Sequence, residues 1–79
     1  MDFSDKETLH RIDVQVGKNI RYRREELKMS QQRLADALGV SFQQVQKYEN
    51  AQNRVSASRL FAISEVLDIP LARLFSDIA

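Results

Sequence analysis

The sequence predicts one compact all-α domain made of five short helices. Its apolar residues recur three or four positions apart, which is the spacing of a helix face, and no stretch alternates as a strand does. Only two glycines and one proline interrupt the 79 residues. A chain of this length buries about 60–65% of its unfolded surface, which suffices for one core but not for a deep substrate cavity as well.

The first helix is predicted over residues 12–28, behind a flexible acidic leader at residues 1–11. We expect a leader there because residues 1–10 carry a net charge of −2 and precede the first apolar stripe. The stripe consists of Ile12, Val16, Ile20 and Leu27. The folded domain is therefore expected to span residues 12–79.

The second helix is predicted over residues 31–38, between two end signals. Ser30 is a preferred N-cap residue, because its hydroxyl can accept a hydrogen bond from an unpaired backbone N–H of the first turn. Gly39 suits the left-handed position that ends a helix. Ala35 is small enough to let another helix cross closely.

The third helix is predicted over residues 42–50. Ser41 and Gln44 have the spacing of a capping box, in which each side chain satisfies a backbone N–H of the other residue. Val45 and Tyr48 are expected to face the core. The second and third helices then form a helix-turn-helix across Gly39.

The last two helices are predicted over residues 57–68 and 70–78. Ser56 is the expected N-cap of the fourth helix, and Pro70 fits the first position of the fifth. The apolar face of the fifth helix contains Leu74, Phe75 and Ile78. These three residues are candidates for self-association, although core packing alone would also account for them.

Composition argues against several classes of function. No cysteine is present, which excludes disulfides and thiolate metal sites and suits a reducing cytoplasm. His10 is the only histidine, so neither a metal site nor a Ser/His/Asp triad is expected. No apolar run approaches the ~18 residues of a membrane span. We expect a soluble cytoplasmic protein that is not an enzyme and has no cofactor, no metal and no membrane partner.

Charge is unevenly distributed along the chain. Residues 11–33 carry a net charge of +4, residues 34–58 are neutral and residues 59–79 carry −1. Such asymmetry is a mild indication of a polyanionic partner, although a solvated helix face often looks the same.

The stretch Ser30–Asn50, SQQRLADALGVSFQQVQKYEN, resembles the helix-turn-helix of the Cro and lambda-repressor (XRE) family. The resemblance extends over about residues 13–76 and includes the run SASRLFAISEVLDIP after the motif. It implies a five-helix lambda-repressor-like domain that binds specific double-stranded DNA as a transcriptional regulator, most simply a repressor. Ala51 stands where the family often has glycine, so Asn50 or Asn53 is expected to adopt the left-handed conformation instead.

Four residues on the outer face of the third helix are candidates for contacts with DNA bases. On a helix, positions 42, 43, 46 and 47 share one side, opposite Val45, and they are Phe42, Gln43, Gln46 and Lys47. Glutamine can pair with adenine, lysine can donate to guanine, and Phe42 can touch a thymine methyl group or simply shield the start of the helix. A merely solvated polar face is the alternative.

The family resemblance also assigns phosphate contacts and one ion pair. It assigns phosphate contacts to Gln31 and Asn50, with an ordinary exposed position as the alternative for Gln31. Ser41 and Arg54 are further candidates for phosphate contacts, with a solvated surface position as the alternative for Arg54. Arg24 lies in the apolar stripe of the first helix and Glu49 lies beside Tyr48. Because a charge in a core needs a partner, a partly buried salt bridge between these two is expected, as in the family.

A homodimer on a two-fold DNA site is the expected assembly, because one such module buries too little surface for tight binding. A protein-interaction or antitoxin-type module with the same fold is the alternative function, since fold alone does not determine function. The polar character of positions 43, 46 and 47 favours DNA, because a protein interface is more often filled by aromatic and aliphatic residues.

Overall fold

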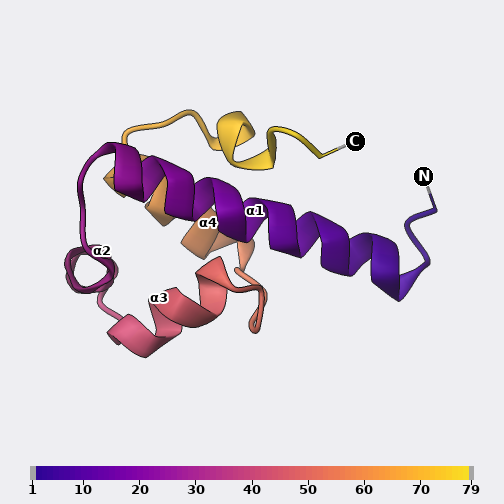
Figure 1. Cartoon of the computed structure of the whole chain (residues 1–79), viewed down its shortest axis with the longest axis horizontal. Helices are drawn as coiled ribbons and strands as arrows, with labels where there is room; N and C mark the ends of the chain where they lie inside the picture. The colour runs from indigo at the N-terminus through magenta and orange to yellow at the C-terminus, as the bar shows by residue number, and fades with distance from the viewer. Residues whose placement is uncertain (1, 79) are drawn as a thin grey trace.

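A computed structural model describes residues 2–78 of the chain. These residues form α1 (Lys6–Glu26), α2 (Gln31–Leu38), α3 (Phe42–Glu49), α4 (Ala57–Val66) and the 3-10 helix η1 (Leu71–Phe75). Figure 1 shows α1 as a long central helix, with α2 and α3 on one side, η1 on the other, and α4 behind it. No strand occurs in residues 2–78, which confirms the all-α prediction.

The first helix begins six residues earlier than predicted. Residues 6–11, expected to belong to a flexible leader, form the first turns of α1. Asp5 is the N-cap, and its carboxylate accepts a hydrogen bond from the backbone N–H of Glu7 at 3.1 Å. The backbone dipole favours acidic residues at this end of a helix. The negative charge of residues 1–10, which was interpreted as a flexible leader, therefore reflects the start of α1.

The helix-turn-helix has the caps that the sequence predicted. The hydroxyls of Ser30 and Ser41 accept hydrogen bonds from the backbone N–H groups of Arg33 and Gln44, at 3.0 and 3.1 Å. Gly39 adopts the left-handed conformation, with φ 71°. Of the capping box expected between Ser41 and Gln44, the bond from the Gln44 backbone N–H to the Ser41 hydroxyl is formed. The side chain of Gln44 makes no bond back to Ser41 within residues 2–78.

The turn after α3 corrects one expectation. Ala51, and neither Asn50 nor Asn53, adopts the left-handed conformation, with φ 57°. The backbone N–H of Ala51 bonds to Tyr48 O, and that of Gln52 bonds to Lys47 O. This pair of bonds is a Schellman motif, which requires the left-handed residue two positions after the end of the helix, whichever residue stands there.

The fifth helix was predicted as an α-helix, and that prediction is wrong. The segment after Pro70 forms only the five-residue 3-10 helix η1. The side-chain amide of Asn19 on α1 donates to Leu74 O at 2.9 Å and to Ser76 O at 2.8 Å. Because these carbonyls bond to Asn19, the backbone turns away after η1 instead of continuing to residue 78.

The core lies between α1, α2, α3, α4 and η1. Its buried apolar residues are Val16, Ile20, Leu34, Ala35, Leu38, Val45, Ile63, Leu67 and Leu74. Leu74 is 0% exposed, so its predicted role in self-association is wrong. Ile78 packs against the core, whereas Phe75 remains 42% exposed.

None of the helices formed by residues 2–78 combines the length and the apolar character that crossing a membrane requires.

Candidate nucleic-acid interface

The outer face of α3 carries polar side chains that the rest of the domain leaves free. Gln43 and Lys47 are exposed, Gln46 is half-buried, and Phe42 is 36% exposed. On the opposite side of the helix, Val45 is fully buried. The side chains of the two glutamines and the lysine take part in no hydrogen bond or ion pair formed within residues 2–78.

The orientation of α3 depends on a buried ion pair with α1. Arg24 Nε and Nη2 donate to the two carboxylate oxygens of Glu49 at 2.7 and 3.1 Å. The two side chains are only 9% and 2% exposed. Arg24 Nη1 also donates to Met29 O at 2.7 Å. The ion pair expected from the sequence is therefore present, and it links the C-terminal ends of α1 and α3.

The electrostatics of this pair favour the charged form of Arg24. Its hydrogen bonds to Glu49 raise the pKa of the Arg24 guanidinium, while burial acts in the opposite direction and the carboxylates of Glu49 and Glu25 add attraction. The stability that comes from the raised pKa is fully present below the ordinary arginine value, and it is lost only when the pH rises above that value. Arg24 consequently remains charged at neutral pH.

Gln31 belongs to the same network. Its side-chain amide donates to Glu49 Oε1 at 3.0 Å, so α2 joins α1 and α3 at this carboxylate. The residue is half-buried rather than freely exposed. The sequence suggested a phosphate contact or an ordinary exposed position for Gln31, because nothing in its spacing indicates a bond to a residue 18 positions away.

The other phosphate candidates lie at the two ends of α3 and beyond it. Ser41 caps the first turn, and exposed Asn50 follows the last turn. Arg54 is 72% exposed, and its Nε lies 3.3 Å from an oxygen of Asp13 on α1. Asn50 and Ser41 bracket the outer face, whereas Arg54 shares its charge with an acidic neighbour.

Gly17 is a close-packed position between α1 and α3 that the sequence reasoning missed. It is buried in α1, where the helix crosses the C-terminal end of α3. A Cβ atom at Gly17 would lie 2.6 Å from Glu49 O and 2.7 Å from Tyr48 O. A glycine inside a helix lowers helix stability, so its presence there was a signal for a close backbone approach.

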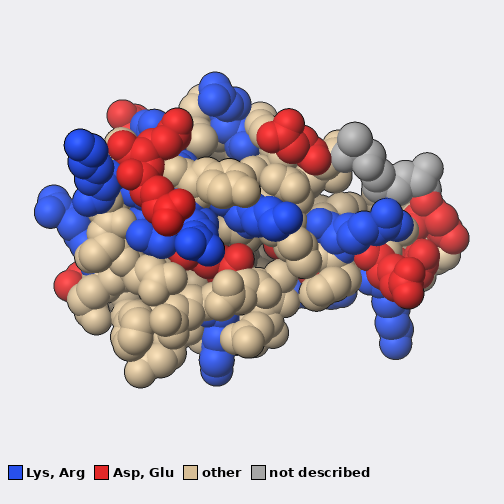
Figure 2. Space-filling model, viewed as in Figure 1, with Lys and Arg blue, Asp and Glu red and all other residues tan. Residues whose placement is uncertain are grey.

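Half of the Lys and Arg residues lie on α1. In Figure 2, Lys and Arg side chains follow the band that α1 occupies in Figure 1, whereas the surface over α2 and α3 is mostly uncharged. Arg21 pairs with Glu25 at 3.4 Å and Arg23 with Glu26 at 3.5 Å. The net charge of +4 for residues 11–33 already subtracts Glu25 and Glu26, so these two pairs do not lower it further.

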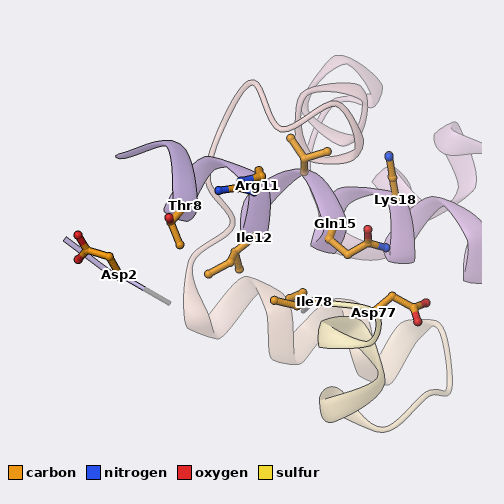
Figure 3. A pocket seen from close by; sticks show the side chains of 9 residues that line it. Asp2, Thr8, Arg11, Ile12, Gln15, Lys18, Asp77 and Ile78 are labelled. Carbon is orange, nitrogen blue, oxygen red and sulfur yellow. The ribbon is translucent and has the colours of Figure 1, made fainter. Parts of the chain in front are cut away.

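A separate pocket lies between the N-terminal half of α1 and the C-terminal segment. It has a volume of about 570 Å³. Figure 3 shows Ile12 of α1 facing Ile78 across it, with Gln15 directed towards Asp77. No α3 residue lines this pocket, so it is distinct from the outer face of the helix-turn-helix. Across residues 2–78, histidine and acidic side chains form no group suited to a metal ion.

Comparison with known proteins identifies the family. The family model described as Helix-turn-helix matches residues 20–74, which include α2, the turn and α3. The chain belongs to the helix-turn-helix family. The match confirms the Cro and lambda-repressor resemblance and the helix-turn-helix expected from Ser30–Asn50.

Relatives in this helix-turn-helix family are named as regulators. An uncharacterized transcriptional regulator in the ATPase CF(0) region of Rhodospirillum rubrum is 49% identical over 78 residues, which cover 99% of this chain and 72% of that protein. An uncharacterized HTH-type transcriptional regulator of Sinorhizobium medicae is 53% identical over 66 residues, covering 84% of this chain. The match covers only 48% of the Sinorhizobium protein, so the chain corresponds to about half the length of that relative.

A solved structure has the same fold. The restriction-modification controller protein C.AhdI from Aeromonas hydrophila superimposes with a TM-score of 0.75 at 31% sequence identity. The match covers 78% of this chain and 94% of the controller protein. Most of this chain thus shares its fold with nearly the whole of the controller protein.

Proposed function

We propose that this chain is a sequence-specific DNA-binding domain of a transcriptional regulator, and that α3 enters the major groove. Membership of the helix-turn-helix family supports this function. On its inner side, α3 is anchored to the domain through Glu49. On its outer side, the side chains of Gln43, Gln46 and Lys47 have no intramolecular partner within residues 2–78. This contrast is the observation that carries the proposal. The proposal assigns no catalytic role to any residue.

In this proposal the outer face of α3 contacts base edges. The amides of Gln43 and Gln46 suit adenine, whose N6 and N7 present one donor and one acceptor. The ammonium of Lys47 suits the guanine acceptors O6 and N7, and Phe42 suits a thymine methyl group. Lys47 carries the only charge among these four side chains, so most of the discrimination would come from hydrogen-bond geometry.

Phosphate contacts would position the helix in the groove. Ser41 and Asn50 lie at opposite ends of α3, which suits contacts to the backbone on either side of the groove. Gln31 donates one amide hydrogen to Glu49 and retains a second for a phosphate oxygen. Arg54 is exposed enough to exchange Asp13 for a phosphate.

We further propose a homodimeric repressor that acts in the cytoplasm, where its target DNA lies. Two copies would occupy half-sites about 34 Å apart, one helical turn of DNA. Leu74 is excluded from the contact between copies by its burial. Phe75 and Leu71 of η1 and Phe61 of α4 are exposed apolar side chains that we propose for that contact. Sedimentation of the protein with and without duplex measures the assembly.

The proposed function is tested by titrating duplex DNA at several salt concentrations. Each phosphate that the protein neutralises releases condensed cations, so affinity should fall at least tenfold between about 50 and 200 mM salt. Asn50→Asp, which adds a negative charge at an exposed end of α3, should weaken binding to every duplex. Capture of a partner protein from nuclease-treated extract, together with salt-independent or absent DNA binding, would contradict the proposal and favour an interaction module.

A further inference from the structure

The C-terminal end of α3 is the place where three helices meet. Arg24 of α1 and Gln31 of α2 both donate to the carboxylate of Glu49, the last residue of α3. Gly17 of α1 faces the main-chain oxygens of Glu49 and Tyr48 in the same turn. Both α1 and α2 therefore hold this end of the helix through direct contacts.

The contact at Gly17 leaves no room for a side chain. A Cβ atom at Gly17 would lie 2.6 Å from Glu49 O and 2.7 Å from Tyr48 O, and both of these atoms belong to the main chain. Main-chain atoms of a packed helix end cannot swing aside as the tip of a flexible side chain does. Any larger residue must therefore push the backbones of α1 and α3 apart by several tenths of an ångström.

A displacement of this size matters more for base contacts than for phosphate contacts. Hydrogen bonds to base edges need donor–acceptor distances of about 2.7–3.2 Å and near-linear geometry, and a paired contact must satisfy two at once. A contact with the charged phosphate backbone tolerates a wider range of positions. Gln43 lies six residues before Glu49, about 9 Å along the helix, so a tilt at the C-terminal end is carried to the outer face.

We propose that Gly17 is a positioning residue for DNA sequence discrimination, although it is buried in the domain and lies against the backbone of α3. Its missing side chain sets how closely α3 approaches α1, while Arg24 and Gln31 fix Glu49 at that distance. Together they aim Gln43 and Lys47 at the bases. This inference rests on the proposed function and adds to it the residue that determines the pose of α3.

The test compares Gly17→Ala with Ile63→Val, a conservative change in the buried part of α4. Two probes are used, namely a duplex enriched from a random pool by the wild-type protein and a scrambled duplex of equal composition. The ratio of the two affinities should fall about tenfold in Gly17→Ala, comparable to weakening one base contact. It should stay unchanged in Ile63→Val. Equal ratios in the two folded variants would overturn the inference.

A second readout does not depend on DNA. Residual dipolar couplings of the amide groups give the angle between α1 and α3, which should change in Gly17→Ala and not in Ile63→Val. An unchanged angle would overturn the inference. If the wild-type protein enriches no sequence, the proposed function fails, and the couplings still decide whether Gly17 sets the pose of α3.

Gln31→Ala keeps the inference testable if Gly17→Ala does not fold. This change removes one hydrogen bond to Glu49 without inserting an atom, and Gln32→Ala on the exposed side of α2 is its control. The affinity ratio should fall about threefold in Gln31→Ala, because an anchoring bond to a charged group is lost. Equal losses on both duplexes, or no loss compared with Gln32→Ala, would contradict a positioning role.

Discussion

The two sides of α3 differ in whether their polar side chains are hydrogen-bonded within the domain. On the inner side, Glu49 accepts hydrogen bonds from two nitrogens of Arg24 and from the amide of Gln31. On the outer side, Gln43 and Lys47 form no side-chain bond within residues 2–78. A buried charge is tolerated only when its bonds are satisfied, whereas an exposed donor already bonds to water and can exchange it for a ligand. In the proposed function, Glu49 therefore fixes the orientation of α3, whereas Gln43 and Lys47 contact the DNA.

The largest effect is expected from removing the inner anchor. Glu49→Ala leaves the buried guanidinium of Arg24 without its carboxylate, and such a loss typically costs about 3–5 kcal/mol. The free energy of unfolding in urea should fall by that amount, while Glu65→Ala at an exposed position of α4 should stay within about 0.5 kcal/mol of the wild type. A loss below about 1 kcal/mol for Glu49→Ala would show that the pair does not anchor the helix.

Neighbouring residues on the two sides of α3 offer a direct contrast. Val45→Ala removes two methyl groups from a fully buried site, which should lower the free energy of unfolding by about 2–3 kcal/mol. Gln46→Ala, the adjacent change on the half-buried outer side, should alter it by about 0.5 kcal/mol or less. Thermal or urea denaturation measures both, and equal losses would contradict the assignment of the two sides.

The outer face should affect DNA binding without affecting folding. Gln43→Ala and Lys47→Ala should each weaken binding to the preferred duplex by about 1–3 kcal/mol. Their melting temperatures should match the wild type, since these side chains are exposed. Competition against an unrelated duplex provides the control. Equal losses on both duplexes would assign these residues to general electrostatic attraction.

The smallest effect concerns the turn that ends α3. Ala51 has φ 57°, a conformation that costs a non-glycine residue about 1–2 kcal/mol. Ala51→Gly should therefore raise the free energy of unfolding by about 0.5–1 kcal/mol, after the greater freedom of glycine in the unfolded chain is subtracted. Ala37→Gly, the same change within α2, should act in the opposite direction. A loss of stability in Ala51→Gly would contradict the backbone geometry of this turn.

Sequence reasoning succeeded where local chemistry decides the structure. The caps at Ser30 and Ser41 and the turn at Gly39 follow from side chains within three or four residues of the backbone they satisfy. The ion pair of Arg24 and Glu49 could be expected because a charge within an apolar stripe needs a partner. These features locate α2 and α3 to within one residue of the predicted ends.

Some failures came from contacts between distant parts of the chain, whereas the helix start at Asp5 and the left-handed Ala51 are local features that were misinterpreted. The bonds from Asn19 to the C-terminal segment shorten the predicted fifth helix, and they join residues 55 and 57 positions apart. The same docking buries Leu74, which the apolar pattern could not distinguish from an exposed contact residue. Gly17 did give a local signal, a glycine within a helix, but only the packing of α1 on α3 explains it.

Selection of bound duplexes from a random pool tests the role of α3 most directly. The wild-type protein should enrich one sequence arranged as two related half-sites about 34 Å apart. Lys47→Ala should enrich a sequence with a changed base at one position of each half-site. A folded wild-type protein that enriches no sequence over the starting pool would contradict base recognition by this helix.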